Sequence, residues 1–140
     1  MDIPDINVWL ALVDENHVNH ASAVRYGQET GDSPIAFVRV TMSGFLRLST
    51  RPGVLSRPLA SGEAWKVYGE FLALPNLRLL AEPEALDDHF RSLTEKTGLP
   101  HHLWTDAYLA AFAIAGGHRM VSFDAYFARF PGLDFLHLGA

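Results

Sequence analysis

Residues 105–124 decide the fold, and their sequence is TDAYLAAFAIAGGHRMVSFD. Residues 103–115 are apolar on nearly every side at helical spacing, which predicts a helix that packs centrally in the domain. Gly116 and Gly117 end this helix, residues 119–123 then predict a strand, and Asp124 follows directly. A buried helix that leads at once into a buried strand is typical of layered α/β domains.

The rest of the chain continues this alternation of strands and helices. Residues 3–9 predict a short strand that runs into a helix ending near Val13. Parallel strands joined by helices require helices on both faces of the sheet. We therefore expect one domain, residues 1–140, with a mostly parallel sheet of four to five strands flanked by helices. The further predicted strands are 34–38, 77–81, 119–123 and 133–138, and the further predicted helices are 19–29, 39–50, 61–74, 83–97 and 103–115.

Composition narrows the class of protein. The chain is 49% hydrophobic and has no cysteine, so disulfides and thiolate metal sites are excluded. Its longest apolar run is far shorter than the ~20 residues that cross a bilayer, and its acidic start does not resemble a secretory signal. We expect a cytoplasmic protein with no membrane partner. Because the net charge is -5, nucleic-acid binding would need a local basic patch and metal ions.

Three aspartates stand in apolar surroundings. Asp5 and Asp124 lie late in, or just after, predicted strands, and Asp106 lies in the first turn of the apolar helix. Ligands of parallel α/β sheets bind beyond the carboxyl ends of the strands. No Lys or Arg lies within three residues of Asp5 or Asp106. If the fold brings the three carboxylates together, their mutual repulsion favours a divalent cation between them.

An all-oxygen site of this kind favours Mg²⁺ or Mn²⁺ over zinc. The reaction that fits is hydrolysis of a phosphodiester by a metal-activated water. Each aspartate also has a structural interpretation, because acidic residues commonly cap helices or occupy their first turn. A third interpretation makes Asp5 the nucleophile of a phosphotransferase, although Asp5-Ile6-Asn7 lacks a second acid two residues on.

Four segments resemble PIN domains, the VapC-type toxins of bacterial toxin–antitoxin pairs. They are PDINV at 4–8, GFLR at 44–47, DAYLAA at 106–111 and VSFDAYFARFPGL at 121–133. The resemblance implies a PIN-like three-layer sandwich and a Mg²⁺- or Mn²⁺-dependent endoribonuclease that cleaves an RNA substrate. It also implies a homodimer and a cognate antitoxin that binds over the active site. By the same resemblance, the catalytic metal ligands are Asp5, Asp106 and Asp124.

The resemblance assigns supporting roles as well. Ser122 stands where the family usually has Thr and is expected to orient Asp124, while Asn7 is expected to brace Asp5. Arg47 is a candidate RNA contact, with a buried ion pair as the alternative. The family usually has a Glu just before the Gly-Phe-Leu-Arg segment, and here Met42 occupies that position. The alternative function is therefore a catalytically attenuated PIN-like module that binds RNA or protein.

Other polar and aromatic residues have more ordinary interpretations. Arg39, Ser43, Arg47 and Arg51 follow four-residue spacing and form either a phosphate clamp or a solvated helix face. His17 and His20 suit a helix start better than a zinc site, and the pair His101 and His102 suits a polar loop. The spacing of Trp65, Tyr68, Phe71 and Leu72 indicates a core or interface rather than a base-stacking surface, since Lys66 is the one nearby cation in the sequence.

Overall fold

In the computed structural model of this chain, which describes residues 1–95 and 98–139, five strands form one sheet. All neighbouring strands pair in parallel, in the spatial order β3-β2-β1-β4-β5. The predicted parallel sheet is confirmed, with its last strand at an edge. The strands are β1 (Asp2–Pro4), β2 (Ile35–Phe37), β3 (Leu77–Leu79), β4 (Arg119–Ser122) and β5 (Asp134–His137).

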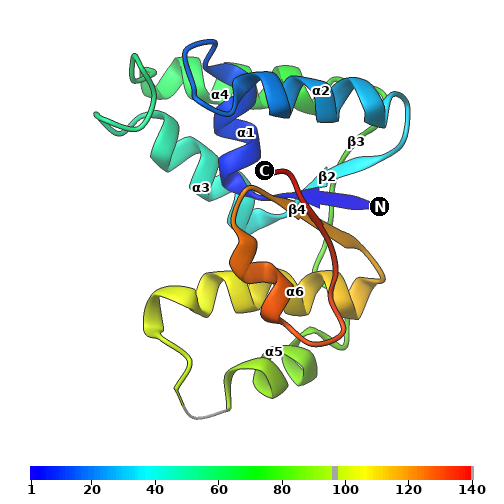
Figure 1. Cartoon of the computed structure of the whole chain (residues 1–140). Coiled ribbons are helices and arrows are strands. Elements are labelled where there is room, and N and C mark those ends of the chain that lie inside the picture. The colour runs from blue at the N-terminus through cyan, green and yellow to red at the C-terminus, as the bar shows by residue number, and fades with distance from the viewer. Residues whose placement is uncertain (96–97, 140) are drawn as a thin grey trace.

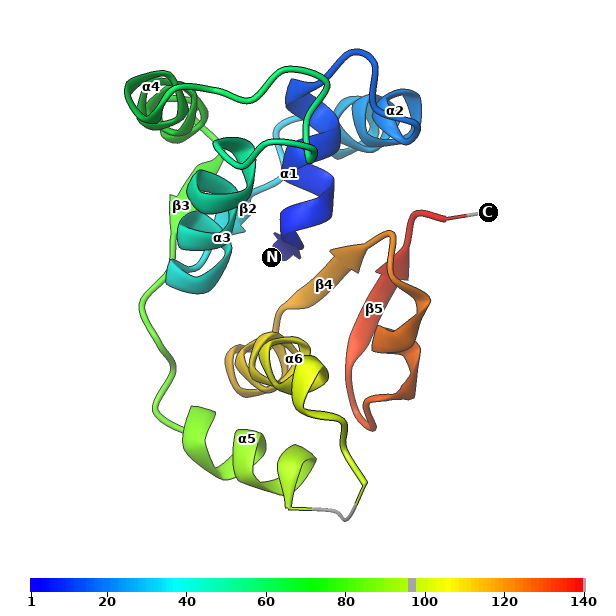
Figure 2. The same ribbon diagram turned by 90° about the vertical axis from the view of Figure 1, so that its left-hand side faces the viewer.

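Helices cover both faces of the sheet, which gives the predicted three layers (Figure 1). One layer holds α1 (Ile6–Val13), α2 (His20–Thr30), α3 (Arg39–Ser49) and α4 (Ser61–Leu72). The other holds α5 (Leu86–Thr94) and α6 (Trp104–Gly116), and Figure 2 shows the sheet between the two layers. Two short 3₁₀ helices, η1 (His101–Leu103) and η2 (Ala125–Arg129), lead into α6 and towards β5.

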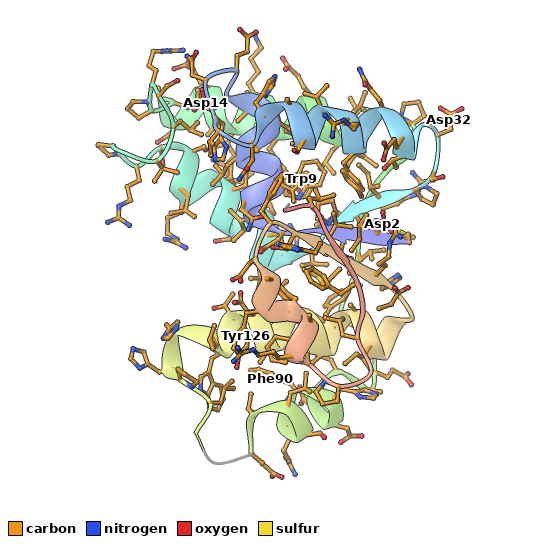
Figure 3. All side chains as sticks on the ribbon, viewed as in Figure 1. Asp2, Trp9, Asp14, Asp32, Phe90 and Tyr126 are labelled. Carbon is orange, nitrogen blue, oxygen red and sulfur yellow. The ribbon has the colours of Figure 1, made fainter. Side chains whose placement is uncertain are left out.

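The hydrophobic core lies in two parts, one on each side of the sheet. On the side of α1, the rings of Trp9 and Phe37 stack with centroids 3.9 Å apart. On the side of α6, Met120 of the sheet packs in a cluster with Phe112 and Phe127. Figure 3 shows Trp9 in the upper layer, with Phe90 and Tyr126 in the lower layer. The central strand β2 is buried at every position and apolar throughout, whereas the edge strands β3 and β5 carry exposed polar residues.

The N-terminal strand is shorter than predicted, because β1 ends at Pro4 and α1 begins at Ile6. Asp5 makes this sharp change of direction possible, since it has an extended backbone and its carboxylate caps the first N–H of α1. The indole N–H of Trp9 donates to the carbonyl oxygen of Pro4 at 3.1 Å and ties the helix back to the strand. Asp5 therefore lies at the carboxyl edge of the sheet, directly after the last residue of β1.

The order of the strands defines where a ligand is expected. The chain proceeds outward from β1 through β2 to β3, then returns to the other side of β1 with β4 and β5. The direction of winding thus reverses between β1 and β4, and the crevice beyond their carboxyl ends is the usual binding place in such sheets.

The predicted helix 83–97 is observed as α5, and its predicted last residues, 96 and 97, lie outside the described residues. No helix in the described ranges has the length and apolarity that crossing a bilayer requires.

Candidate active site

Asp5 is fixed at the carboxyl end of β1. Its backbone N–H donates to the carbonyl oxygen of Val121 in β4 at 2.8 Å. The residue is only 8% exposed, and one carboxylate oxygen accepts the N–H of Ile6 at 2.8 Å. Burial raises the pKa of Asp5; hydrogen bonds from Ser122 and Ile6 oppose this rise, and the charge of Asp124 adds to it. The carboxylate is thus held in one orientation in a place that disfavours its charge.

Ser122, the last residue of β4, connects three residues of the site. Its buried hydroxyl donates to the second carboxylate oxygen of Asp5 at 2.8 Å. The hydroxyl oxygen of Ser122 also accepts from the side-chain amide of Asn7 at 3.1 Å and from the backbone N–H of Asp124 at 2.9 Å. Asn7 in turn accepts the N–H of Phe123 at 3.3 Å. Ser122 therefore orients the carboxylate of Asp5 and the backbone, not the carboxylate, of Asp124, while Asn7 braces Ser122 rather than Asp5.

Asp124 follows β4 and caps η2. Its carboxylate accepts the backbone N–H of Tyr126 at 2.9 Å, and the residue is exposed. Asp124 thus has the structural role of a helix cap, which was one of the two roles considered for it. That role does not exclude a second role, because one N–H leaves most of the acceptor positions of an ionised carboxylate open.

Asp106 comes from a different layer, in the first turn of α6, and is half-buried. Burial is the largest cause that raises the pKa of Asp106 to about 7, followed by the charges of Asp5 and then Asp124. The three carboxylates therefore act on one another electrostatically although more than a hundred residues separate the first from the last. Within residues 1–95 and 98–139, none of the three forms a salt bridge.

We call Asp5, Asp106 and Asp124 the acidic site. In the part of the chain that the structure describes, no group of three or more Asp, Glu or His side chains is placed to hold one metal ion together. Mg²⁺ does not need such a cage, because it is usually bound by one or two carboxylates and keeps several waters. The possible ligands are carboxylate oxygens that repel one another and have no basic partner. Such ligands fit a hard divalent cation that is bound by few carboxylates and keeps its waters.

Comparison with known proteins identifies the family. A family model described as PIN domain matches residues 3–133. The chain belongs to the PIN domain family. It is 38% identical over 137 residues to Ribonuclease VapC41 of Mycobacterium tuberculosis, and the match covers 93% of each chain.

Solved structures share the fold. VapBC2 of Rickettsia felis, bound to a DNA fragment from their promoter, superposes with a TM-score of 0.73 at 16% identity over 97% of each chain. VapC20 of M. tuberculosis, described as a Sarcin-Ricin loop cleaving toxin, gives 0.69 at 14% identity over 95% of this chain and 98% of that chain. The PIN-like sandwich predicted from sequence motifs is confirmed.

Met42 does not border the acidic site of this PIN domain. It packs against the apolar cluster that includes Trp9 and lines a groove between α3 and α4. Val40 and Gly44 lie two positions away, which is about 200° around a helix, and these two face the side of Ile6. A Cβ at Gly44 would collide with the side chain of Ile6 unless that side chain moved, so Gly44 lies directly against Ile6. The wall that α3 presents beside the acidic site therefore carries no carboxylate.

That wall carries arginines instead. Arg39, Ser43 and Arg47 line a groove of about 310 Å³, which Ile6 and Thr105 complete. Ile6 follows Asp5 and Thr105 precedes Asp106, so this arginine groove lies next to the acidic site. Both arginines are exposed, and neither forms a salt bridge with the described residues. The buried ion pair considered for Arg47 is not formed there, and its position suits contact with a phosphate.

The histidines do not form a metal site within the described ranges. His17 contacts the N–H of Asn19 at 3.0 Å through its ring, and the ring of His20 contacts the carbonyl oxygen of Ala11 at 2.7 Å. Both rings thus stabilise the turn between α1 and α2, as expected for a helix start. His101 and His102 are exposed in η1, as expected for a polar connection.

Proposed function

We propose that this chain, as a single PIN domain over residues 1–140, is a metal-dependent endoribonuclease that acts as the toxin of a toxin–antitoxin pair. The relative VapC41 is named a ribonuclease and matches nearly the whole chain. The observation that carries the chemistry is the electrostatic coupling of three unneutralised aspartates from three elements, at the reversal of strand order. The attenuated binding module is not favoured, because the similarity to a ribonuclease extends through all four motifs.

The roles of the residues follow from their positions. Asp5, Asp106 and Asp124 would hold Mg²⁺ or Mn²⁺ between them, some of them through the waters that the ion keeps rather than directly. The bound ion would lower the pKa of a water and stabilise negative charge on the leaving oxygen. Ser122 keeps the Asp5 carboxylate in its orientation, and Asn7 keeps Ser122 in place. Arg39 and Arg47 bind the phosphates of RNA beside the acids and so align the backbone for attack.

The proposed partners are a cognate antitoxin and RNA. VapBC2 of R. felis shares the fold over almost its full length, which supports an antitoxin partner for this chain too. An antitoxin that covers the acidic site would relieve its charge repulsion with basic groups, as the net charge of -5 allows. A homodimer and a cytoplasmic location remain predictions.

The function is tested with the purified chain, free of antitoxin, and structured RNAs in Mg²⁺, Mn²⁺ or EDTA. We expect cleavage with either ion, no cleavage in EDTA, and none with Asp124→Asn. The matched control is Asp32→Asn, which removes the same charge from an exposed turn that precedes β2, at the end of the sheet opposite the carboxyl ends of the strands (Figure 3 labels Asp32). Absence of metal-dependent cleavage, or equal cleavage by Asp124→Asn and the wild type, contradicts the proposal.

A further inference from the structure

Trp65 is a large aromatic side chain that α4 holds at the surface, with 58% of the residue exposed. Its ring makes a T-shaped contact with Tyr68, with centroids 6.1 Å apart, and Tyr68 is buried. The indole thus rests on the core at one side and is open to solvent over more than half of its surface. Tryptophan is enriched at binding surfaces, where one part of the ring rests on the protein and another part is open to a ligand.

A groove of about 470 Å³ lies beside this ring, between α3 and α4. We call it the tryptophan groove; its lining includes Met42, Leu46, Ala64 and Trp65. Two further lining residues, Ser43 and Arg47, also line the arginine groove next to the acidic site. The two grooves therefore share a wall that includes Arg47, and the arginine groove continues to Ile6 and Thr105, the sequence neighbours of Asp5 and Asp106.

The charge along this path suits a nucleic acid. Arg47 stands between the indole and the acidic site and is exposed, with no salt bridge to any described residue. Arg39 lies farther along the same groove. A protein whose net charge is -5 thus presents cations along the path between its exposed ring and its acids. The sequence placed only Lys66 near Trp65, and the tertiary structure adds Arg47.

We propose that the tryptophan groove binds an unpaired base of the RNA substrate, which stacks on Trp65 while Arg47 binds a phosphate between that base and the scissile bond. The inference rests on the proposed ribonuclease function and names the form of its substrate. Stacking needs an exposed aromatic ring beside a cation, which is the arrangement observed. A base within a duplex is already stacked, so the substrate must present this nucleotide in a loop or single strand.

Continuity with the arginine groove favours RNA over a protein segment as the occupant. An apolar anchor of a protein partner would use the indole, Met42 and Leu46, but it would have no need of Arg47. A nucleotide chain uses the ring and the cation together, and its backbone continues towards the acidic site. The base sits on the apolar wall and the phosphate on Arg47.

The experiment compares Trp65→Leu, which keeps an apolar side chain, with Trp65→Phe, which keeps an aromatic ring. Binding to a fluorescein-labelled, unstructured oligoribonucleotide of about ten nucleotides is measured in EDTA, so that no cleavage occurs. We expect Trp65→Leu to weaken binding about 10-fold and Trp65→Phe to keep most of the affinity. Leu74→Ala, which trims an exposed apolar side chain beyond the C-terminal end of α4, should bind as the wild type does.

Abasic scanning then locates the base. The same oligoribonucleotide is made with one abasic ribose at each position in turn. For the wild type, one position should lose about 10-fold in affinity, whereas Trp65→Leu should show no further loss at that position. This non-additivity separates a direct stacking contact from a general loss of folding.

Failure of this inference is distinguishable from failure of the proposed function. If the wild type cleaves RNA and Trp65→Leu binds and cleaves equally well, the stacking inference is overturned alone. If Trp65→Leu binds RNA normally but loses the antitoxin, the groove is a protein surface and the inference is overturned as well. If the wild type shows the abasic pattern but cleaves no RNA with any metal, base stacking is supported and the nuclease function fails.

Discussion

Two aspartates at opposite ends of the same short strand have opposite surroundings. Asp2 opens β1, and its carboxylate receives both Nε (3.0 Å) and Nη2 (2.9 Å) of Arg119 and the hydroxyl of Tyr26 at 2.8 Å. Asp5 follows the strand, and its carboxylate receives one hydroxyl and one backbone N–H. The charge of Asp124 raises the pKa of Asp5, and the charge of Asp5 raises the pKa of Asp106. Figure 3 shows Asp2 at the edge of the sheet where the strands begin.

The difference separates an acid that stabilises the fold from one that is kept available for a ligand. Arg119 neutralises Asp2 with two parallel hydrogen bonds, and burial with the charge of Asp2 raises the pKa of Tyr26, so its hydroxyl stays a donor. At the acidic site the folded state holds like charges together without such a partner. That arrangement costs stability, and it persists where binding of a cation relieves it.

The largest effect is expected from paired substitutions at the two ends of β1. Asp5→Asn should lower kcat for RNA cleavage roughly 1,000-fold, because it removes a ligand of the proposed ion that stabilises the transition state. Asp2→Asn should leave kcat within about 2-fold and lower the free energy of unfolding by roughly 1–2 kcal/mol, because it weakens the pair with Arg119. Kinetics and denaturant unfolding measure the two effects, and a loss of activity with Asp2→Asn would remove the contrast.

The second effect concerns Ser122, which links Asp5 to Asp124. Ser122→Ala removes the hydroxyl donor to Asp5 and the acceptor for two N–H groups, so we expect a 10- to 100-fold loss of activity. Ser122→Thr keeps the hydroxyl and should retain most of it. A positioning role also predicts weaker binding of Mn²⁺ by the alanine variant, measured by titration calorimetry. Equal Mn²⁺ affinity in all three proteins would show that Ser122 acts on the fold alone.

The third effect is on stability and depends on pH. The raised pKa of Asp106, about 7, means that the folded protein binds a proton more tightly than the unfolded chain does. Stability should therefore be greatest below about pH 4 for this group and fall as pH rises to 7. In EDTA at pH 8, Asp106→Asn should be more stable than the wild type by roughly 1–2 kcal/mol, a value reduced for the part of the side chain in water. The gain should shrink steadily as pH is lowered, and a constant difference across this range would exclude the electrostatic cause.

The smallest effect is expected at Met42. Met42→Glu supplies the acid that the family usually has, but on the side of α3 that faces α4. It should not raise RNA cleavage or Mn²⁺ affinity, and it should lower stability modestly because Met42 packs against the apolar cluster. Met42→Leu is the control for packing. A gain of activity with Met42→Glu would show that α3 rotates to present this position to the acidic site.

Local sequence patterns predicted the helices and strands, but they did not predict which residues of different elements contact one another. The apolar run before Gly116 predicted α6, and short apolar segments between the helical stretches predicted all five strands, because both kinds of pattern are local in the sequence. The side of α3 on which Met42 lies was not predicted, because motif spacing does not fix which face of a helix packs against which neighbour. The contact of Ser122 with Asp5 joins residues more than a hundred positions apart, and no local signal carries it.

The amino-acid sequence alone determined the α/β alternation, the three aspartates and their resemblance to PIN domains, since periodicity and motif identity are properties of short segments. Tertiary structure decided which acid is neutralised and which is not, and it placed Arg47 between Trp65 and the acidic site. Charge compensation depends on distances between side chains from different elements, and those distances exist only after the strands have paired and the helices have packed.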